Sequence, residues 1–366
     1  MDKKIINEIE NISKYMIEDI ISIVKIDSIK SEECKNAPFG SGIKEALDKT
    51  LALAENLGFQ TTNIDNYIGY ASYGKSDNYV CAIGHLDVVE VGKGWKQPPF
   101  SGHTENGVIY SRGILDNKGP IISCLYALYA LKKLNIDLKH EVRIIFGCDE
   151  ESGFEDLKYY LKKEKPPVMG FTPDCKYPVV YAERGRALIE VKGDKGNLEG
   201  FFSFVNDYIL NSKNNGEKLG IDINDKEFGN LECRNYSLLY NENPSVRFSV
   251  SYPANTNCEE IVGKIKKLIS NFEVKCISNF NPIKFEKDCF LVDTLKKTYE
   301  AITGKDGTPV TTTGGTYAKL MPNIVPFGPS FPGQKGIGHQ PNEWMSIDDI
   351  ITNAKIYALS LYYLAK

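Results

Sequence analysis

Two short apolar runs constrain this chain most, because polar residues able to bind metal follow each of them. The first run, Tyr79–Gly84, continues into His85-Leu86-Asp87, and the second, Val142–Gly147, is followed by Asp149-Glu150-Glu151. Such runs predict buried strands, and the helical segments between them predict an α/β sheet with helices on both faces. Side chains at the carboxyl ends of these strands lie where open α/β sheets bind ligands. The sequence therefore predicts a polar site at one edge of the sheet.

Further carboxylates and a histidine occupy equivalent positions. Asp116 lies in a glycine-flanked turn before a predicted helix, Asp174 follows an apolar stretch, and His339 lies in a loop ahead of the last helix. Each of them alone is typical of a helix cap or a solvated charge. Together they offer imidazole nitrogen and carboxylate oxygen atoms, both of which zinc binds as ligands. Asp87, two residues after His85, is placed to fix the imidazole tautomer.

The segment 185–286 separates these motifs, contains none of the candidate metal ligands and has a different order of predicted elements. Its apolar patterns predict, in order, a strand, a helix, two strands, a helix and a strand, at 187–191, 198–210, 236–240, 246–252, 258–272 and 274–277. The order βαββαβ is that of the ferredoxin-like unit. A chain of 366 residues has room for two domains. We therefore predict a catalytic domain over 1–184 and 287–366, with 185–286 as an inserted domain.

The composition excludes several classes of partner. A net charge of -4 gives no general attraction to nucleic acid or to an anionic membrane. No apolar stretch approaches the roughly 18 residues that a membrane span requires. The nine cysteines are scattered and include no CxxC pair, and the N-terminus shows helical periodicity where a signal peptide would be uniformly apolar. These features predict a cytoplasmic protein with reduced cysteines.

Several segments, taken in their order along the chain, resemble the motifs of a large family of di-zinc peptidases. This family includes carnosinases, aminoacylases, acetylornithine deacetylase and succinyl-diaminopimelate desuccinylase. In this sequence the segments read Gly84-His85-Leu86-Asp87, Arg112-Gly113, Asp116-Asn117-Lys118-Gly119, Asp149-Glu150-Glu151-Ser152-Gly153 and Asp174. The later segments Thr313-Gly314-Gly315-Thr316-Tyr317-Ala318, Phe331-Pro332-Gly333 and His339-Gln340 resemble the monomeric bacterial dipeptidase branch. The resemblance covers nearly all of the two outer segments, whereas only the element order agrees through the insert.

The resemblance implies a role for each matching residue. His85 and Asp174 would bind one zinc ion, Glu151 and His339 the other, and Asp116 would bridge the two, with manganese or cobalt as substitutes. Asp87 would orient His85, and Glu150 would be the general base toward a metal-bridged water. Gly314, Gly315 and Thr316 would lie along the substrate, and the insert would form a lid. The implied reaction is cleavage of an amide bond in a dipeptide or short peptide.

The insert departs from the family pattern in two ways that leave alternatives open. The family's lid histidine, which helps to stabilise the oxyanion, has no counterpart, since no histidine lies between His140 and His339. Ser251 stands where the family places a substrate-binding arginine, and Arg247, which shares its strand face, is the candidate substitute. We therefore keep two alternatives, an N-acyl-amino-acid deacylase and a metal-binding homologue with little activity. The sequence is compatible with a monomer or a homodimer.

Overall fold

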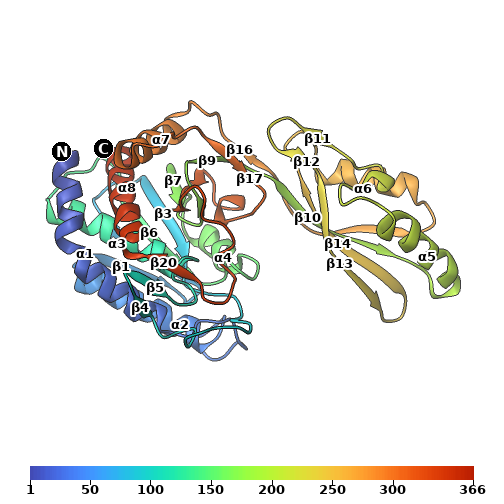
Figure 1. The fold of residues 1–366 in the computed structure, drawn as a ribbon, viewed down its shortest axis with the longest axis horizontal. Coiled ribbons are helices and arrows are strands. Elements are labelled where there is room, and N and C mark those ends of the chain that lie inside the picture. The colour runs from blue at the N-terminus through green and yellow to red at the C-terminus, as the bar shows by residue number, and fades with distance from the viewer. The chain divides into compact units, whose positions relative to one another are not determined.

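The computed structural model describes residues 1–366 and divides into two compact units (Figure 1). Unit 1 comprises Met1–Val180, Glu286–Val310 and Thr316–Lys366, and unit 2 comprises Tyr181–Phe285 and Thr311–Gly315. Unit 2 is thus inserted within the chain of unit 1. Whether 1–184 with 287–366 and 185–286 fold as separate domains stays a prediction. None of the helices combines the length and apolar character needed to cross a bilayer.

A six-stranded mixed sheet forms the centre of unit 1, in the order β1-β2-β6-β3-β7-β18. Its strands are β1 (Gln60–Ile64), β2 (Ile68–Tyr73), β3 (Tyr79–His85), β6 (Glu141–Gly147), β7 (Met169–Thr172) and β18 (Ile324–Pro326). The strands from β6 to β18 pair in parallel, whereas β2 pairs antiparallel with both β1 and β6. Every residue of β3 is buried, as expected for a parallel strand covered on both faces. The two predicted strands, β3 and β6, are confirmed, and the structure shows that they are neighbours.

Two glycines show that helices cover both faces of this sheet. In the β3–β6 register Gly84 is opposite Phe146 and His85 is opposite Gly147, so Gly84 and Gly147 face opposite sides. A Cβ on Gly84 would lie 3.0 Å from Ile121 of α3, and a Cβ on Gly147 would lie 2.8 Å from Asp156 of α4. Helix α3 also packs against α1 and α8 (Figure 1). The helices of unit 1 are α1 (Asp2–Val24), α2 (Ser41–Asn56), α3 (Lys118–Lys133), α4 (Glu155–Lys163), α7 (Phe290–Thr303) and α8 (Ile347–Ala365).

Short strands join segments that are far apart in the chain. The hairpin of β4 (His103–Glu105) and β5 (Val108–Tyr110) pairs with β20 (Trp344–Ser346). Strand β8 (Cys175–Lys176) pairs in parallel with β19 (Pro329–Ser330), and the 3₁₀ turn η4 spans Tyr317–Lys319. A further three-stranded sheet has the order β16-β9-β17, formed by β9 (Val180–Glu183), β16 (Ile283–Lys284) and β17 (Val310–Thr312).

Unit 2 contains a four-stranded antiparallel sheet in the order β13-β14-β10-β15. Its elements along the chain are β10 (Gly185–Lys192), α5 (Leu198–Phe204), β13 (Glu232–Tyr240), β14 (Pro244–Tyr252), α6 (Cys258–Leu268) and β15 (Glu273–Phe280). The predicted βαββαβ order is observed. The predicted helix 198–210 is only partly regular, because a π-helical turn over Val205–Leu210 follows α5. Additional short elements are η1 (Lys195–Asn197), η3 (Glu217–Leu219), β11 (Asn224–Asp225) and β12 (Gly229–Asn230).

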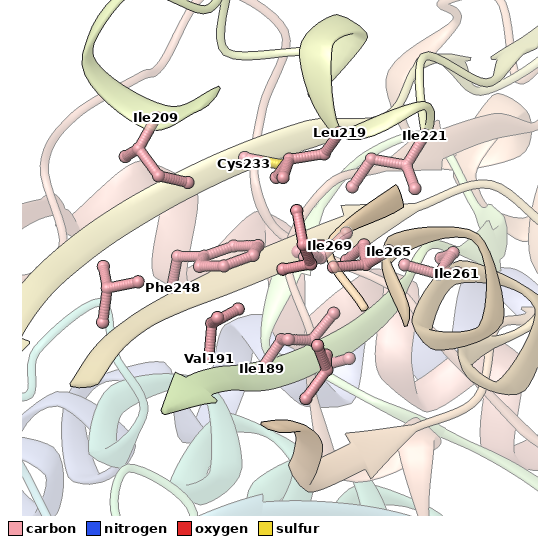
Figure 2. Close-up of a cluster of buried hydrophobic side chains, with 14 of the residues drawn as sticks. Ile189, Val191, Ile209, Leu219, Ile221, Cys233, Phe248, Ile261, Ile265 and Ile269 are labelled. Carbon is pink, nitrogen blue, oxygen red and sulfur yellow. The ribbon is translucent and has the colours of Figure 1, made fainter. Parts of the chain in front are cut away.

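One face of this sheet carries the core of unit 2. Strand β10 alternates buried and partly exposed residues, with Ile189 and Val191 pointing inward. Figure 2 shows these side chains on one side of the sheet together with Phe248 of β14 and with Ile261 and Ile265 of α6. Burial of each such side chain stabilises the fold by roughly 1.5–3 kcal/mol. The alternation of buried and partly exposed residues along β10 therefore reflects packing of one sheet face against helices.

Candidate metal centre

Three neighbouring strands deliver the predicted ligands to one edge of the unit 1 sheet. His85 is the last residue of β3, Glu150 and Glu151 follow β6, and Asp174 lies two residues beyond the end of β7. Because β3 pairs in parallel with both β6 and β7, the carboxyl ends of all three strands meet. Neighbouring strands in a sheet are about 5 Å apart, which brings side chains from adjacent ends within reach of a shared ion.

The donor atoms of these residues form two overlapping groups. Donor atoms of His85, Glu150 and Asp174 all lie within 4.8 Å of one another, and so do those of His85, Asp116 and Glu151. Asp116 comes from the turn before α3, as the sequence predicts. Glu150 lies as close to His85 and Asp174 as a ligand would, although its expected role is that of a base. The geometry therefore brings the predicted base and ligands together.

His339 reaches the same cluster from a distant part of the chain. Its Nε2 lies 2.8 Å from Glu151 Oε1 and 3.0 Å from Asp116 Oδ2. The residue has φ 61°, in the left-handed region that non-glycine residues rarely adopt. Such conformations persist where the surrounding structure enforces them, and they concentrate at functional sites. His339 is half exposed whereas His85 is fully buried, so the cluster extends from the interior to the surface.

The backbone carbonyl of Asp87 makes the shorter contact with His85, and the Asp87 carboxylate accepts hydrogen bonds from other residues. His85 Nδ1 lies 2.8 Å from the Asp87 carbonyl oxygen and 3.4 Å from Asp87 Oδ1. His85 Nε2 lies 3.1 Å from Asp116 Oδ1. When Nδ1 donates to the Asp87 carbonyl, Nε2 is the ring nitrogen that would bind a metal ion. The Asp87 carboxylate accepts the backbone N–H groups of Glu150 (3.2 Å) and Glu151 (3.1 Å). Asp87 therefore connects the ends of β3 and β6.

A buried ion pair that the sequence does not predict connects the Asp116 turn to the His339 loop. Glu343 and Arg112 are each 1% exposed, and Glu343 Oε2 lies 2.7 Å from Arg112 Nη1. Glu343 Oε1 accepts the backbone N–H groups of Leu115 (2.9 Å) and Asp116 (3.1 Å). Arg112 lies within a motif segment and Glu343 follows His339 by four residues, but nothing in a sequence reveals a pairing across 231 positions. Glu343 thus positions the turn that carries Asp116.

Asn117 connects the ends of β3 and β7 in a similar way. Its Oδ1 accepts the backbone N–H of His85 (3.3 Å), and its amide donates to the carbonyl of Pro173 (2.6 Å). A Cβ on Gly84 would lie 2.1 Å from Asn117 Oδ1, so only glycine at position 84 leaves room for this contact. The sequence alone predicts no role for Asn117 or for Gly84. Their position inside the motif segments was the available signal.

A second buried acid supports the turn after β6. Asp156 accepts the backbone N–H groups of Cys148 (2.6 Å) and Asp149 (3.1 Å), and the Tyr317 hydroxyl donates to it. The Tyr317 ring centroid lies 6.4 Å from that of His85. Tyr317 thereby ties the end of the Gly314–Thr316 segment to the turn that carries Glu150 and Glu151.

The electrostatics of the cluster fit divalent cations. Removal from water and repulsion by Asp174 raise the pKa of Glu150 well above its usual range, and burial and the Asp116 charge do the same for the pKa of Asp174. Burial disfavours ionisation of Asp116, but hydrogen bonds from His339 and His85 outweigh it and lower the pKa of Asp116. Hydrogen bonds to Asp116 and Glu151 raise the pKa of His339 to about 10. Several carboxylates thus share a site with too little positive charge, which two divalent cations would supply.

The predicted substrate-binding residues fall in both units. Gly314 and Gly315 belong to unit 2, whereas Thr316 belongs to unit 1 and accepts the backbone N–H of Ala318 at 3.2 Å. Arg247 belongs to unit 2 and pairs with Glu190 of β10, with 2.7 Å between Nε and Oε1. The roles of these residues, like those of the predicted ligands and base, remain predictions.

Comparisons with known proteins place the chain in a family. It is 28% identical to the "Putative dipeptidase YtjP" of Bacillus subtilis, covering 98% of this chain and 99% of that protein. It is also 28% identical to the "Beta-Ala-Xaa dipeptidase" of Lactobacillus delbrueckii, covering 96% of each. The structure of human carnosine dipeptidase 1 superposes with a TM-score of 0.75 at 15% identity, covering 100% of this chain and 98% of that one. The model of the peptidase family M20/M25/M40 matches residues 81–362, a span that includes all the clustered residues, and the chain is therefore a hydrolase that belongs to this family of metallopeptidases.

Proposed function

We propose that this protein is a metal-dependent dipeptidase that cleaves an amide bond in a dipeptide or short peptide. One observation carries the proposal: His85, Asp116, Glu150, Glu151, Asp174 and His339 converge at the carboxyl edge of one sheet. The names of the two bacterial relatives support the dipeptide substrate class. Both relatives align along almost their whole length, so their reaction class is a reasonable expectation for the whole chain.

The proposed ligands divide the cluster between two zinc ions, which manganese or cobalt would replace. His85 and Asp174 would hold one ion, Glu151 and His339 would hold the other, and Asp116 would contribute to both. Two such ions, when bound, lower the pKa of a water molecule and polarise the scissile carbonyl. The two Asp116 oxygens support the bridging role, because Oδ1 lies 3.1 Å from His85 Nε2 and Oδ2 lies 3.0 Å from His339 Nε2.

Glu150 acts as the general base in this proposal. Its carboxylate oxygen accepts a proton from the attacking water and then delivers it to the leaving nitrogen. This role is supported by the donor atoms of Glu150, His85 and Asp174, which lie within 4.8 Å of one another. Asp87 positions Glu150 by accepting its backbone N–H.

Unit 2 acts as the lid, with Gly314, Gly315 and Thr316 along the substrate and Arg247 as the group that binds a substrate carboxylate.

One observation favours an N-acyl-amino-acid deacylase as second candidate. The four histidines are His85, His103, His140 and His339, so unit 2 contains none to stabilise an oxyanion. One oxyanion donor is worth roughly 3–4 kcal/mol in the transition state. Its replacement is compatible with a different substrate class.

A paired assay tests the proposal. Protein loaded with zinc, manganese or cobalt is given a panel of dipeptides with free N-termini and a matched panel of N-acyl-amino acids. We expect hydrolysis of dipeptides, and a loss of at least about 100-fold in turnover for Glu150→Gln at unchanged metal content. Hydrolysis of the acyl panel alone would assign the deacylase activity. Wild-type turnover by Glu150→Gln would mean that another residue is the base, and a drop in its metal content would make Glu150 a ligand.

A further inference from the structure

A small cavity in unit 1 borders the proposed metal ligands. It has a volume of about 200 Å³, and its lining includes Asp116, Asp174 and Gly338. Ser330 and the segment 334–337 contribute further parts of the lining. Sites that enclose a whole small molecule usually have volumes of about 300–1,000 Å³. This cavity therefore has the size expected for one side chain or terminal group of a substrate whose scissile bond lies at the metal ligands.

Lys335 is the single cationic side chain among the residues that line this cavity. It is exposed, and it forms no ion pair or hydrogen bond within the chain. The acidic residues of the lining are Asp116 and Asp174, both of which the proposed function assigns to metal ions. Once cations offset those charges, Lys335 supplies an uncompensated ammonium group at the cavity. An ammonium group in this position favours an anionic group on the ligand.

The backbone that carries Lys335 is held in place by the residue before it. Gln334 Oε1 accepts the backbone N–H of Phe331 (2.9 Å), and the backbone N–H of Gln334 donates to the Phe331 carbonyl (3.0 Å). Gln334 Nε2 donates to Asp349 Oδ2 in the first turn of α8 (2.8 Å). The turn that contains Gln334 follows β19. Strand β19 pairs with β8, and residues of both strands line the cavity. A binding group on such a supported turn loses less freedom when it binds a ligand.

We propose that this cavity is a substrate subsite in which Lys335 binds a carboxylate of the peptide, so that the enzyme prefers substrates bearing an acidic group there. The inference rests on the proposed function and adds a substrate class to it. The carboxylate has two chemical sources, the side chain of a glutamate or aspartate residue and the free C-terminus. Both present the same anionic oxygens to the ammonium group.

Steady-state kinetics on matched dipeptides test the subsite. The substrates pair glutamate with glutamine at each of the two positions, and a free with an amidated C-terminus. For Lys335→Gln we expect kcat/KM to fall by about tenfold for the carboxylate-bearing member of one pair and to stay nearly unchanged for its neutral partner. The pair that responds identifies the source of the carboxylate. Lys335→Arg should retain the preference, because it keeps the cation.

The controls separate this inference from the proposed function. Lys14→Gln removes the same charge from α1, where the lysine side chain is 82% exposed, and should leave every ratio unchanged. Metal content should equal that of the wild type in all variants. If metal-loaded wild type hydrolyses no dipeptide, the proposed function fails. If it hydrolyses dipeptides with ratios that Lys335→Gln does not alter, only the inference is overturned.

Discussion

Unit 1 and unit 2 bury different kinds of side chain. Unit 1 encloses charged groups that are at most 2% exposed and tied by hydrogen bonds, among them His85, Asp87, Arg112 and Glu343. In unit 2 the fully buried charged residues are Glu183 and Arg184, which precede β10, and the core between its sheet and helices is apolar. Burying charge is costly unless each group is paired. The comparison indicates that unit 1 accepts this cost to preorganise chemistry, whereas unit 2 derives its stability from packing.

The largest effect should come from removing the residue at the centre of the cluster. Asp116→Ala deletes both carboxylate oxygens that face His85 and His339, so we expect loss of metal from both sites and loss of activity. Metal equivalents per chain, measured by mass spectrometry, check this outcome. Asp207→Ala, which removes an exposed carboxylate of unit 2, is the control. A variant that retained two equivalents would show that Asp116 does not bridge.

A core truncation in unit 2 should destabilise packing without touching the metal centre. Phe248 is fully buried and stacks with Tyr236 at 5.6 Å, so Phe248→Ala should cost about 3–5 kcal/mol of unfolding free energy. Faster hydrogen exchange in β10 and β14 would locate the loss. Ser249→Ala, at the next position on the other sheet face, should have little effect. If Phe248→Ala also released metal, the two units would not be independent as the comparison implies.

Removing the Glu343 charge should weaken the metal centre from outside it. Glu343→Gln leaves Arg112 without its counter-ion and weakens the support of the Asp116 turn, so we expect metal affinity to fall by about 10–100-fold. Competition with a chelator measures this change. Glu141→Gln breaks the ion pair with Arg143 at the opposite end of β6 and should leave metal affinity intact. Unchanged affinity in Glu343→Gln would reduce Glu343 to a purely structural role.

The smallest effect on stability is expected at the ion pair of unit 2. The Arg247 side chain is 41% exposed, so breaking its pair with Glu190 should change the free energy of unfolding by only about 0–1 kcal/mol. Substrate binding is a separate readout. Both Arg247→Ala and Glu190→Ala break the ion pair, but only Arg247→Ala removes the guanidinium cation. A higher KM in Arg247→Ala alone would support the role of Arg247 toward a substrate carboxylate. Equal KM values in both variants would argue against it.

Much of unit 1 and of its candidate site could be read from local sequence. The apolar runs of β3 and β6 each end at residues that can bind metal, and short buried strands followed by polar residues need no distant information to be recognised. The βαββαβ order of unit 2 was readable for the same reason, since period-2 and helical patterns are local. The π-helical turn after α5 was missed because the apolar pattern of 198–210 is also that of one regular helix. The β11–β12 hairpin was missed because its two-residue strands are polar and carry no apolar alternation.

Sequence alone determined which residues can bind a metal and which segments form strands, because side-chain chemistry and apolar periodicity are properties of the chain. The tertiary structure decided which of these residues meet. Strand β3 lies between β6 and β7, so Glu151 and Asp174 flank His85, and the loop before β20 brings His339 to Glu151 across 188 positions. The tertiary structure also brings the Asp87 carboxylate to two backbone amides and pairs Glu343 with Arg112. Such contacts depend on strand order and on the closure of long loops, and neither leaves a periodic signal in the chain.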